Sequence, residues 1–245
     1  MIHLGDCLEK LRELPDESVE AVITDPPYCS GGFNEAQKQL AKGQGLRTET
    51  IDEIGWFFSD NMSTGGITWL MRHVGLELFR VMKPSASLLM FTDWRMLINL
   101  APVIESCGFQ YRALIVWDKG SPGLGNGFRP QHELIILFVK GSAQFFDNST
   151  GNVLRSQRMS PQKRIHQTEK PTDLLAKLLK VTTKEGDTVL DPFFGSGSLG
   201  EACLKMNRKF IGIEKSKFYV QEATRRIEGV KANIDTSLFS YSDCR

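Results

Sequence analysis

Short apolar strings alternate with helical patterns along most of this 245-residue chain, and this alternation constrains the fold more than any other feature. Each string is apolar on successive residues, as strands buried on both faces of a sheet are. Strings of this kind that alternate with helices predict an α/β fold with a mostly parallel sheet. The expected strands are Ala21–Thr24, Ser87–Thr92, Ala113–Trp117, Leu134–Val139, Thr188–Leu190 and Phe210–Ile213.

Three amphipathic helices are expected between or after these strands. Their apolar residues recur at helical spacing, which places them on one face of a helix. The first stripe stops at Lys83-Pro84 because the residue before a proline avoids helical geometry, and the second follows Pro171, a residue favoured near helix starts. The stripes are Met71, Val74, Leu78 and Met82; Leu174, Leu175, Leu178 and Leu179; and Val220, Ala223, Ile227 and Val230.

Length and composition are those of an ordinary globular protein. A chain of 245 residues can build one full core, so residues 1–245 are expected to form a single domain. The 30 basic and 29 acidic residues give a net charge of +1, which excludes a globally basic coat but not a local DNA-binding surface. No apolar run approaches the ~20 residues of a membrane span, and the N-terminus lacks a secretory signal.

The five cysteines are odd in number, scattered and without a C-x-x-C pair. This pattern argues against a disulfide framework and against a zinc site, and it favours a reducing cytosol. We therefore expect a cytoplasmic protein with no metal and no membrane partner.

Three segments do not fit the alternation and are expected to be loops that grip a substrate. Residues 29–68 carry seven glycines, and residues 119–130 carry four. Residues 141–165 carry four basic residues and a single acid.

The first motif, Asp25-Pro26-Pro27-Tyr28, directly follows an expected strand. Two consecutive prolines fix the backbone and remove two N–H donors, so the chain leaves the sheet stiffly. A carboxylate, a free carbonyl and an aromatic ring are thereby held at a strand's carboxyl end, where open α/β sheets bind ligands. The alternative is a Pro-Pro turn with Asp25 as a local cap and Tyr28 as a lid on the core.

The second motif is Asp191-Pro192-Phe193-Phe194-Gly195-Ser196-Gly197-Ser198-Leu199-Gly200. Its glycines satisfy G-x-G-x-x-G at a strand-to-helix turn, and Glu214 ends the next strand nineteen residues after Gly195. This is the arrangement of an adenosine site, in which an acid accepts hydrogen bonds from ribose hydroxyls. The alternative is a tight structural turn. Asp191 would repel a pyrophosphate and suits a cationic ligand with an amino group, such as S-adenosylmethionine.

The motifs together resemble the β-type amino-methylating DNA methyltransferases, the N6-adenine and N4-cytosine family. The resemblance is carried by Gly5-Asp6-Cys7, Thr24-Asp25-Pro26-Pro27-Tyr28, Lys83-Pro84, Val116-Trp117-Asp118-Lys119, Gln131-His132-Glu133, His166-Gln167-Thr168-Glu169-Lys170-Pro171 and the glycine motif. It implies a Rossmann-like S-adenosylmethionine-dependent methyltransferase fold: a seven-stranded, mostly parallel sheet with one antiparallel strand. The tetrapeptide precedes the glycine loop, which is the family's circularly permuted β order.

The resemblance implies a catalytic group of Asp25, Pro26, Pro27 and Tyr28. The Asp25 carboxylate and the Pro26 carbonyl would accept hydrogen bonds from an exocyclic base amine and direct its lone pair toward the methyl group. Tyr28 would stack on a base flipped out of the duplex. An Asp at the first position is typical of adenine-modifying members, so N6-adenine is expected and N4-cytosine is the alternative.

The resemblance also implies a cofactor site. Its residues would be Asp6 and Cys7 near the adenine; Glu214 on the ribose; Asp191, Gly195, Ser196 and Gly197 along the methionine part; Lys170 near its carboxylate; and Asp25, Phe193, Ser198 and Lys215 as further cofactor contacts. Asp6 has an alternative interpretation as a helix N-cap, and Lys170 as a solvated lysine at a helix start.

The expected partner is double-stranded DNA, and a homodimer is left open. Residues 29–68 and 141–165 are the candidate DNA-contacting and target-recognition segments, because no larger insert is present. The candidate phosphate contacts are Arg129, Arg155, Arg158, Lys163 and Arg164, although basic loops are often only solvated surface.

Two other functions stay open at this point. A nicotinamide-dependent oxidoreductase would use the same glycine loop but leaves Asp25–Tyr28 unexplained. A catalytically idle DNA- or nucleotide-binding protein would retain the fold, although an intact tetrapeptide disfavours decay.

Overall fold

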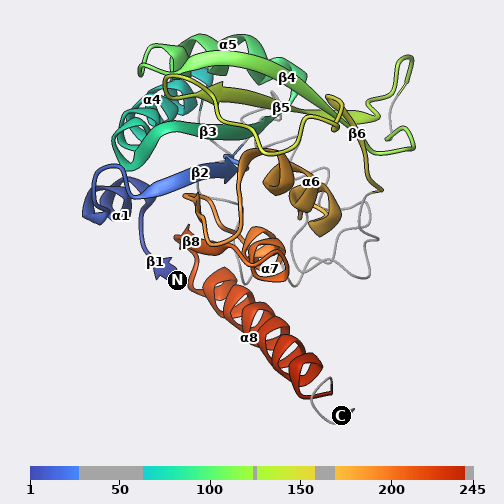
Figure 1. Ribbon diagram of the computed structural model, residues 1–245. Coiled ribbons are helices and arrows are strands. Elements are labelled where there is room, and N and C mark those ends of the chain that lie inside the picture. Colours follow the sequence, from blue (N-terminus) through green and yellow to red (C-terminus); the bar gives the residue numbers. More distant parts are fainter. Residues whose placement is uncertain (28–62, 124–125, 158–168, 241–245) are drawn as a thin grey trace.

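The computed structural model describes residues 1–27, 63–123, 126–157 and 169–240, built around an eight-stranded sheet (Figure 1). The strand order is β1-β8-β7-β2-β3-β5-β4-β6. β5 is antiparallel to both of its neighbours, β3 and β4, whereas all other pairs are parallel. The bounds are β1 Ile2–Leu4, β2 Val19–Thr24, β3 Met82–Thr92, β4 Gln110–Asp118, β5 His132–Val139, β6 Val153–Arg155, β7 Thr188–Asp191 and β8 Lys209–Glu214.

This architecture confirms the predicted α/β class with one antiparallel strand, but the sheet has eight strands rather than seven. β1 and β6 correspond to none of the six expected strands, and β6 pairs with β4 inside residues 141–165, expected to be a loop. Only Leu154 of β6 is buried. A three-residue edge strand with one buried side chain has no apolar string, so its sequence carries no strand signal.

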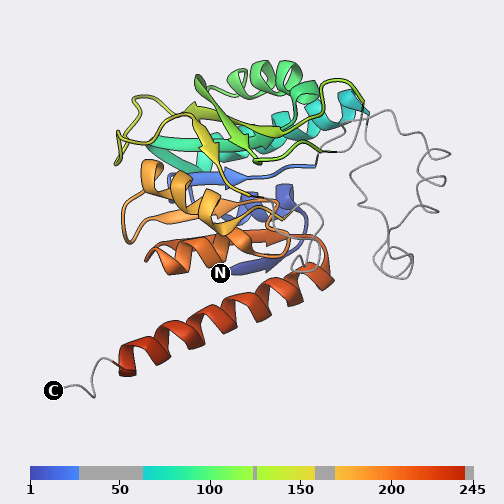
Figure 2. The ribbon, with the colours of Figure 1, turned by 90° about the vertical axis from the view of Figure 1, so that its right-hand side faces the viewer.

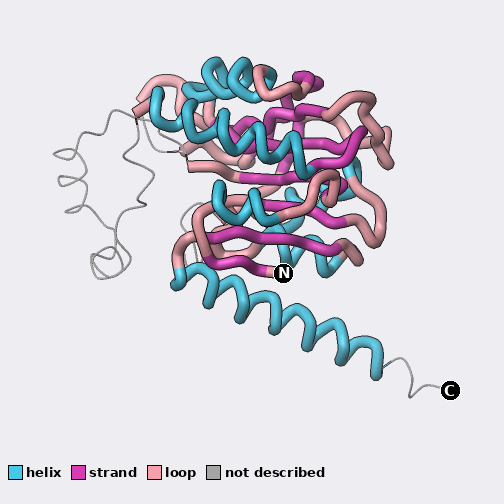
Figure 3. Tube along the Cα trace, turned by 90° about the vertical axis from the view of Figure 1, so that its left-hand side faces the viewer, coloured by secondary structure: helices cyan, strands magenta, loops and turns pink. Residues whose placement is uncertain are grey.

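Helices cover both faces of the sheet, as the tube in Figure 3 shows. One hydrophobic cluster joins α1, α4 and α5 to one face, and a second joins α6, α7 and α8 to the other. The bounds are α1 Cys7–Glu13, α4 Thr64–Val81, α5 Trp94–Glu105, α6 Thr172–Thr182, α7 Ser198–Lys205 and α8 Lys217–Ser240.

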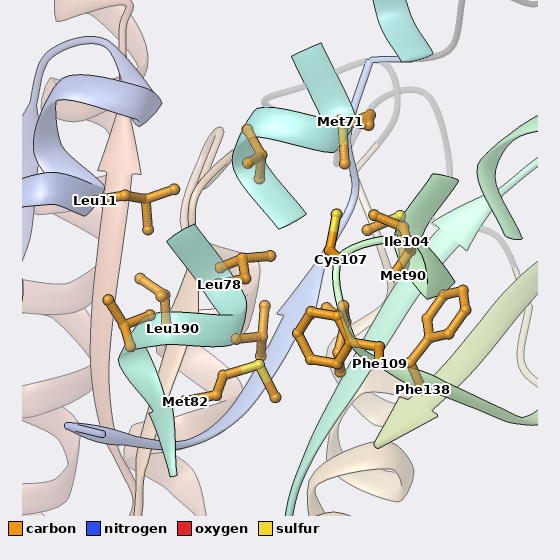
Figure 4. Packing of buried hydrophobic residues seen from close by; sticks show 14 of the residues in the cluster. Leu11, Met71, Leu78, Met82, Met90, Ile104, Cys107, Phe109, Phe138 and Leu190 are labelled. Carbon is orange, nitrogen blue, oxygen red and sulfur yellow. The ribbon is translucent and has the colours of Figure 1, made fainter. Parts of the chain in front are cut away.

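The first cluster lies between α4, α5 and the sheet, and Figure 4 labels Met71 and Leu78 of α4, Ile104 of α5 and Phe138 of β5 among its members. Two boundary predictions are wrong here. Residues 64–68, expected to be loop, form the first turn of α4, which Ser63 caps by accepting a hydrogen bond from the Gly66 N–H at 3.2 Å. The helix ends before Met82, which begins β3 together with Lys83-Pro84.

The second cluster contains the predicted stripes of α6 and α8, and α6 starts after Pro171 as expected. α8 packs on the sheet through Ala223 and Ile227, and Figures 1 and 2 show that it then continues past the other elements. Among the described helices, none is long and apolar enough to cross a membrane.

Candidate active site

The carboxyl ends of the parallel strands meet at one edge of the sheet. Asp25 follows β2, Asp191 ends β7 and Glu214 ends β8. β2 and β7 are paired neighbours, so the two motifs lie side by side as the sequence predicts. The hydroxyl of Thr24 joins them directly, because it donates a hydrogen bond of 2.8 Å to Oδ1 of Asp191.

Asp25 is placed by the stiff exit of the chain from β2. The prolines that follow fix the backbone without offering N–H groups, and Pro26 is buried. The Asp25 side chain keeps 21% of its surface exposed, so its carboxylate remains within reach of a ligand. Tyr28, the last residue of the tetrapeptide, lies outside the described residues.

Asp25 is the first member of a chain of alternating charges. Nζ of Lys170 lies 2.6 Å from Oδ2 of Asp25 and 3.2 Å from Oε2 of Glu133. The ammonium of Lys119 forms an ion pair with the other oxygen of Glu133. Lys170 precedes α6, Glu133 lies near the start of β5 and Lys119 follows β4, so four separate elements contribute.

The ion pairs favour the charged forms of Lys170 and Glu133. Burial alone would lower the pKa of Lys170, but the carboxylates of Asp25 and Glu133 outweigh it and raise the pKa. Burial would raise the pKa of Glu133, but Lys170 and Lys119 outweigh it and lower the pKa. Lys170 is only 6% exposed, which contradicts its alternative interpretation as a solvated lysine.

The glycine loop connects β7 to α7 through left-handed backbone. Gly195 has φ +53° and Gly197 has φ +83°, a region that residues with a side chain rarely adopt. A Cβ at Gly197 would lie 3.0 Å from that of Ala223 in α8, and one at Gly200 would lie 2.8 Å from the Phe194 ring. The left-handed backbone accounts for Gly195 and Gly197, and close packing accounts for Gly197 and Gly200. The glycines therefore have the structural role that a strand-to-helix turn requires.

Asp191 is a buried carboxylate at the start of this loop. Burial raises its pKa to about 7, although the N–H of Phe193 at 3.0 Å and the hydroxyl of Thr24 both donate to it. The negative charges of Asp25 and Glu214 raise this pKa further. A cation bound next to Asp191 would favour its ionised form, so the position suits a positively charged ligand.

Glu214 is held in one orientation by backbone donors. Its Oε2 accepts the N–H of Gly195 at 2.9 Å, and its Oε1 accepts the N–H of Ser216 at 2.7 Å. Burial nevertheless raises its pKa. Each carboxylate oxygen can accept a further hydrogen bond, so the group fits ribose hydroxyls.

Asp6 acts as the N-cap of α1, because its Oδ1 accepts the N–H of Leu8 at 3.0 Å. Its Oδ2 lies 3.5 Å from Nζ of Lys215, which is exposed. β1 pairs with β8, and the N–H of Gly5 donates to the carbonyl of Glu214 at 3.0 Å, so Asp6 shares the edge with Glu214. Burial raises the pKa of the Cys7 thiol to about 12, which keeps it neutral.

The remaining cofactor candidates lie along the same turn. Phe193 is partly buried against the first cluster, Ser196 is buried and Ser198 begins α7. Together with Glu214 and Asp191, these residues fit an adenosine ligand that carries a positive charge. The Glu214 carboxylate is oriented for ribose hydroxyls, and the Asp191 carboxylate, whose pKa is raised to about 7, would be ionised by a nearby cation.

The predicted DNA contacts are described only in part. Arg129 is exposed in the connection from β4 to β5. Arg155 ends β6 with 75% of its side chain exposed, and its Nε lies 3.9 Å from Oδ2 of Asp118. Arg158, Lys163 and Arg164 lie outside the described residues.

Sequence reasoning missed three residues of this edge: Thr24, Lys119 and Glu133. Thr24 is the last residue of β2, Lys119 directly follows β4 and Glu133 is the second residue of β5, so each is a polar residue that borders an apolar string. That position was the available signal, but the partners come from distant segments, so no spacing in the sequence could pair them.

Comparison with known proteins gives a consistent picture. Residues 19–225 match the N6/N4 methyltransferase family model, described as DNA methylase. The chain is 26% identical to the type II methyltransferase M.HinfI of Haemophilus influenzae, over 94% of this chain and 68% of that protein. It is also 26% identical to M.HpaI of Haemophilus parainfluenzae, over 91% of this chain and 73% of that protein.

Solved structures share the fold. The complex of M1.HpyAVI with S-adenosylmethionine has a TM-score of 0.67 at 25% identity and covers 93% of this chain and 98% of that one. The cytosine-N4-specific PvuII DNA methyltransferase has a TM-score of 0.69 at 17% identity, with 94% and 89% covered. A putative modification methylase of Thermus thermophilus, complexed with S-adenosylmethionine, has a TM-score of 0.68 at 19% identity, with 94% and 93% covered.

Proposed function

The chain belongs to the N6/N4 DNA methylase family, and we propose that it methylates the N6 amine of adenine in double-stranded DNA. S-adenosylmethionine is the cofactor, and when bound it supplies an electrophilic methyl group on a cationic sulfur. The observation that carries the proposal is the Asp25 carboxylate, held beside the Asp191–Gly197 turn by the pairing of β2 with β7.

The residues of the chain would act mainly by positioning. A base amine is a poor nucleophile because its lone pair is delocalised into the ring. Hydrogen bonds from this amine to the Asp25 carboxylate and the Pro26 carbonyl would localise the lone pair toward the methyl group, and transfer would be in line with the reacting atoms about 3–3.5 Å apart. The carboxylate charge then stabilises the cationic product amine, which loses its proton readily.

The target amine is hidden inside a duplex, so the proposal includes flipping the base out of the stack. Tyr28 is the proposed stacking partner of the flipped base. Arg129, Arg155, Arg158, Lys163 and Arg164 are the proposed phosphate contacts, which would fix the register of the enzyme on its site.

Adenine is proposed over cytosine because an aspartate occupies position 25. The chemistry of the two amines is alike, and N4-cytosine methylation is the second candidate, favoured by the likeness in fold to a cytosine-N4-specific enzyme. Family membership favours methyl transfer over the nicotinamide-dependent reaction.

The test is a methylation reaction with duplex DNA and isotopically labelled S-adenosylmethionine. The DNA is digested to nucleosides, which are then identified by mass spectrometry. We expect labelled N6-methyladenine with wild-type enzyme and none with Asp25→Ala prepared in the same way, which controls for contaminating methyltransferases. Labelled N4-methylcytosine alone would overturn the adenine assignment, and the absence of any labelled nucleoside would overturn the proposed activity.

A further inference from the structure

We propose that Lys170, Glu133 and Lys119 are positioning residues that hold the Asp25 carboxylate for the methyl-accepting amine, and that Lys170 serves this acceptor side rather than the carboxylate of the cofactor. The inference rests on the proposed function, because it assigns a task within the same reaction.

Geometry separates the two ends of Asp25. Nζ of Lys170 approaches Oδ2 at 2.6 Å, so this oxygen faces the lysine. In the proposed reaction, Oδ1 accepts the amine N–H of the base. Anchoring one oxygen restricts the rotation of the carboxylate, so the hydrogen bond from the base starts from a preorganised direction.

The far end of the chain explains why Lys170 stays on Asp25. A lysine side chain is flexible and loses considerable rotamer entropy when it is fixed. Glu133 holds Lys170 from the second side at 3.2 Å, and Lys119 in turn neutralises Glu133. The ammonium groups also lie over aromatic rings, Lys170 over Phe91 and Lys119 over Trp117, each 5.0 Å from the ring centre.

Burial distinguishes this chain from an ordinary surface network. The side chains of Lys170 and Lys119 are 7% and 9% exposed, and those of Asp25 and Glu133 are 21% and 20% exposed. A buried ion pair adds little net stability because desolvation offsets its attraction. What four alternating charges supply is a fixed carboxylate orientation, and that is the requirement of the proposed reaction.

The main test variant is Glu133→Gln, which keeps the size of the side chain and removes its charge. Without this charge, Lys170 loses its ion pair with Glu133 and retains the one with Asp25. The lysine is then held less firmly, and so is the Asp25 carboxylate. In single-turnover reactions we expect methyl transfer to slow on the order of 10- to 100-fold, while the Kd for S-adenosylmethionine stays within about twofold. The alkaline limb of the pH–rate profile should move to lower pH, because Glu133 raises the pKa of Lys170.

Glu20→Gln is the matched control. Glu20 also ion-pairs with a lysine, Lys83, and also lies at a strand end, but at the opposite edge of the sheet. It should leave the rate, the Kd and the pH profile unchanged. Lys170→Arg keeps the positive charge and should recover more of the rate than Lys170→Met.

The outcomes separate the possible errors. A Kd for S-adenosylmethionine weakened tenfold or more in Lys170→Met, with the methyl-transfer rate unchanged, would assign the lysine to the cofactor and overturn the proposal. A wild-type rate and pH profile in Glu133→Gln would mean that the four alternating charges have only a structural role. If Glu133→Gln does not fold, Lys119→Met at the far end must show the same loss of rate at constant Kd. Wild-type enzyme without any methyl transfer would instead refute the proposed function.

Discussion

Two neighbouring halves of the same sheet edge hold carboxylates in opposite ways. On the half formed by β2, β4 and β5, Asp25 and Glu133 are neutralised by lysines, and the pKa of Glu133 is lowered. On the half formed by β7 and β8, Asp191 and Glu214 accept hydrogen bonds from backbone N–H groups and, for Asp191, a hydroxyl, and both pKa values are raised. Within the described residues, neither of these two acids forms an ion pair.

The difference matches the two reactants. In the proposed reaction, the half formed by β2, β4 and β5 receives the target amine and is called the acceptor half. The amine is neutral, so the charge of this half is balanced before the amine binds. The half formed by β7 and β8, called the donor half, receives S-adenosylmethionine, which carries a cationic sulfur. Its carboxylates need no lysine partner, because the ligand supplies the positive charge. In the proposed reaction, the asymmetry therefore assigns the half formed by β2, β4 and β5 to the methyl acceptor and the half formed by β7 and β8 to the methyl donor.

The largest effect is expected from Asp25→Ala, which removes the acceptor for the target amine. Methyl transfer should fall by at least about 10³-fold, because the interaction is used mainly in the transition state. The Kd for S-adenosylmethionine, measured by equilibrium dialysis, should change only a few fold. Near-normal turnover would contradict the lone-pair mechanism.

A change to the glycine loop should act through the donor half. Gly197→Ala forces a side chain into φ +83° and sets its Cβ 3.0 Å from that of Ala223. We expect unfolding free energy to fall by about 1–3 kcal/mol and cofactor affinity to fall with it. Gly229→Ala in α8, where the added Cβ meets open space, should stabilise by about 0.5–1 kcal/mol. Equal urea midpoints for the two variants would show that the turn tolerates a side chain.

The salt dependence of DNA binding tests whether the acceptor half also faces the duplex. Replacing Arg155, Arg158 and Arg164 with alanine should reduce the log–log slope by roughly 0.9 for each lost phosphate contact. Lys231→Ala on α8 is the control and should leave the slope unchanged, because α8 carries none of the predicted contacts. If the triple variant kept the wild-type slope, these arginines would be solvated surface.

The smallest effect concerns stability and has opposite signs in the two halves. The pKa of Asp191 is raised to about 7 in the folded protein. The free energy of unfolding therefore falls as pH rises from the pKa of an unfolded aspartate toward 7, because the folded state disfavours the charged carboxylate. Asp191→Asn should therefore stabilise the protein at pH 8 by on the order of 1 kcal/mol, and the gain should vanish near pH 4. Glu133→Gln should destabilise at pH 8, because the lowered pKa of Glu133 contributes stability above its unfolded pKa. The measurement is a thermal melt of each variant at both pH values. A shift of both variants in the same direction at pH 8 would contradict the comparison.

The donor half was more predictable from sequence than the acceptor half. Asp191 and Glu214 end consecutive strands and Gly195 follows the first of them, so local spacing relates the three residues to one another. Asp25 was also found, because its tetrapeptide is stiff and follows a buried strand. Its partners Lys170 and Glu133 come from distant segments, and only the pairing of strands brings them together.

The same reasoning explains the errors in the fold. Strings buried on successive residues, such as Leu134–Val139, identify strands reliably. Short edge strands such as β1 and β6 bury too few side chains to leave a pattern. The first turn of α4 was missed because Gly65 and Gly66 favour a loop when they are considered locally, whereas the Ser63 cap and the packing of Ile67 stabilise the helix.

The proton balance of cofactor binding tests the asymmetry between the two halves most directly. Binding enthalpies for S-adenosylmethionine at pH 7, measured by calorimetry in buffers of different ionisation enthalpy, give the protons released per site. Because Asp191 has a pKa of about 7 and a bound cation would ionise it, wild-type protein should release about half a proton more than Asp191→Asn. Glu133→Gln should release as many protons as wild type. Equal release from wild type and Asp191→Asn would contradict the assignment of this half of the edge to the methyl donor.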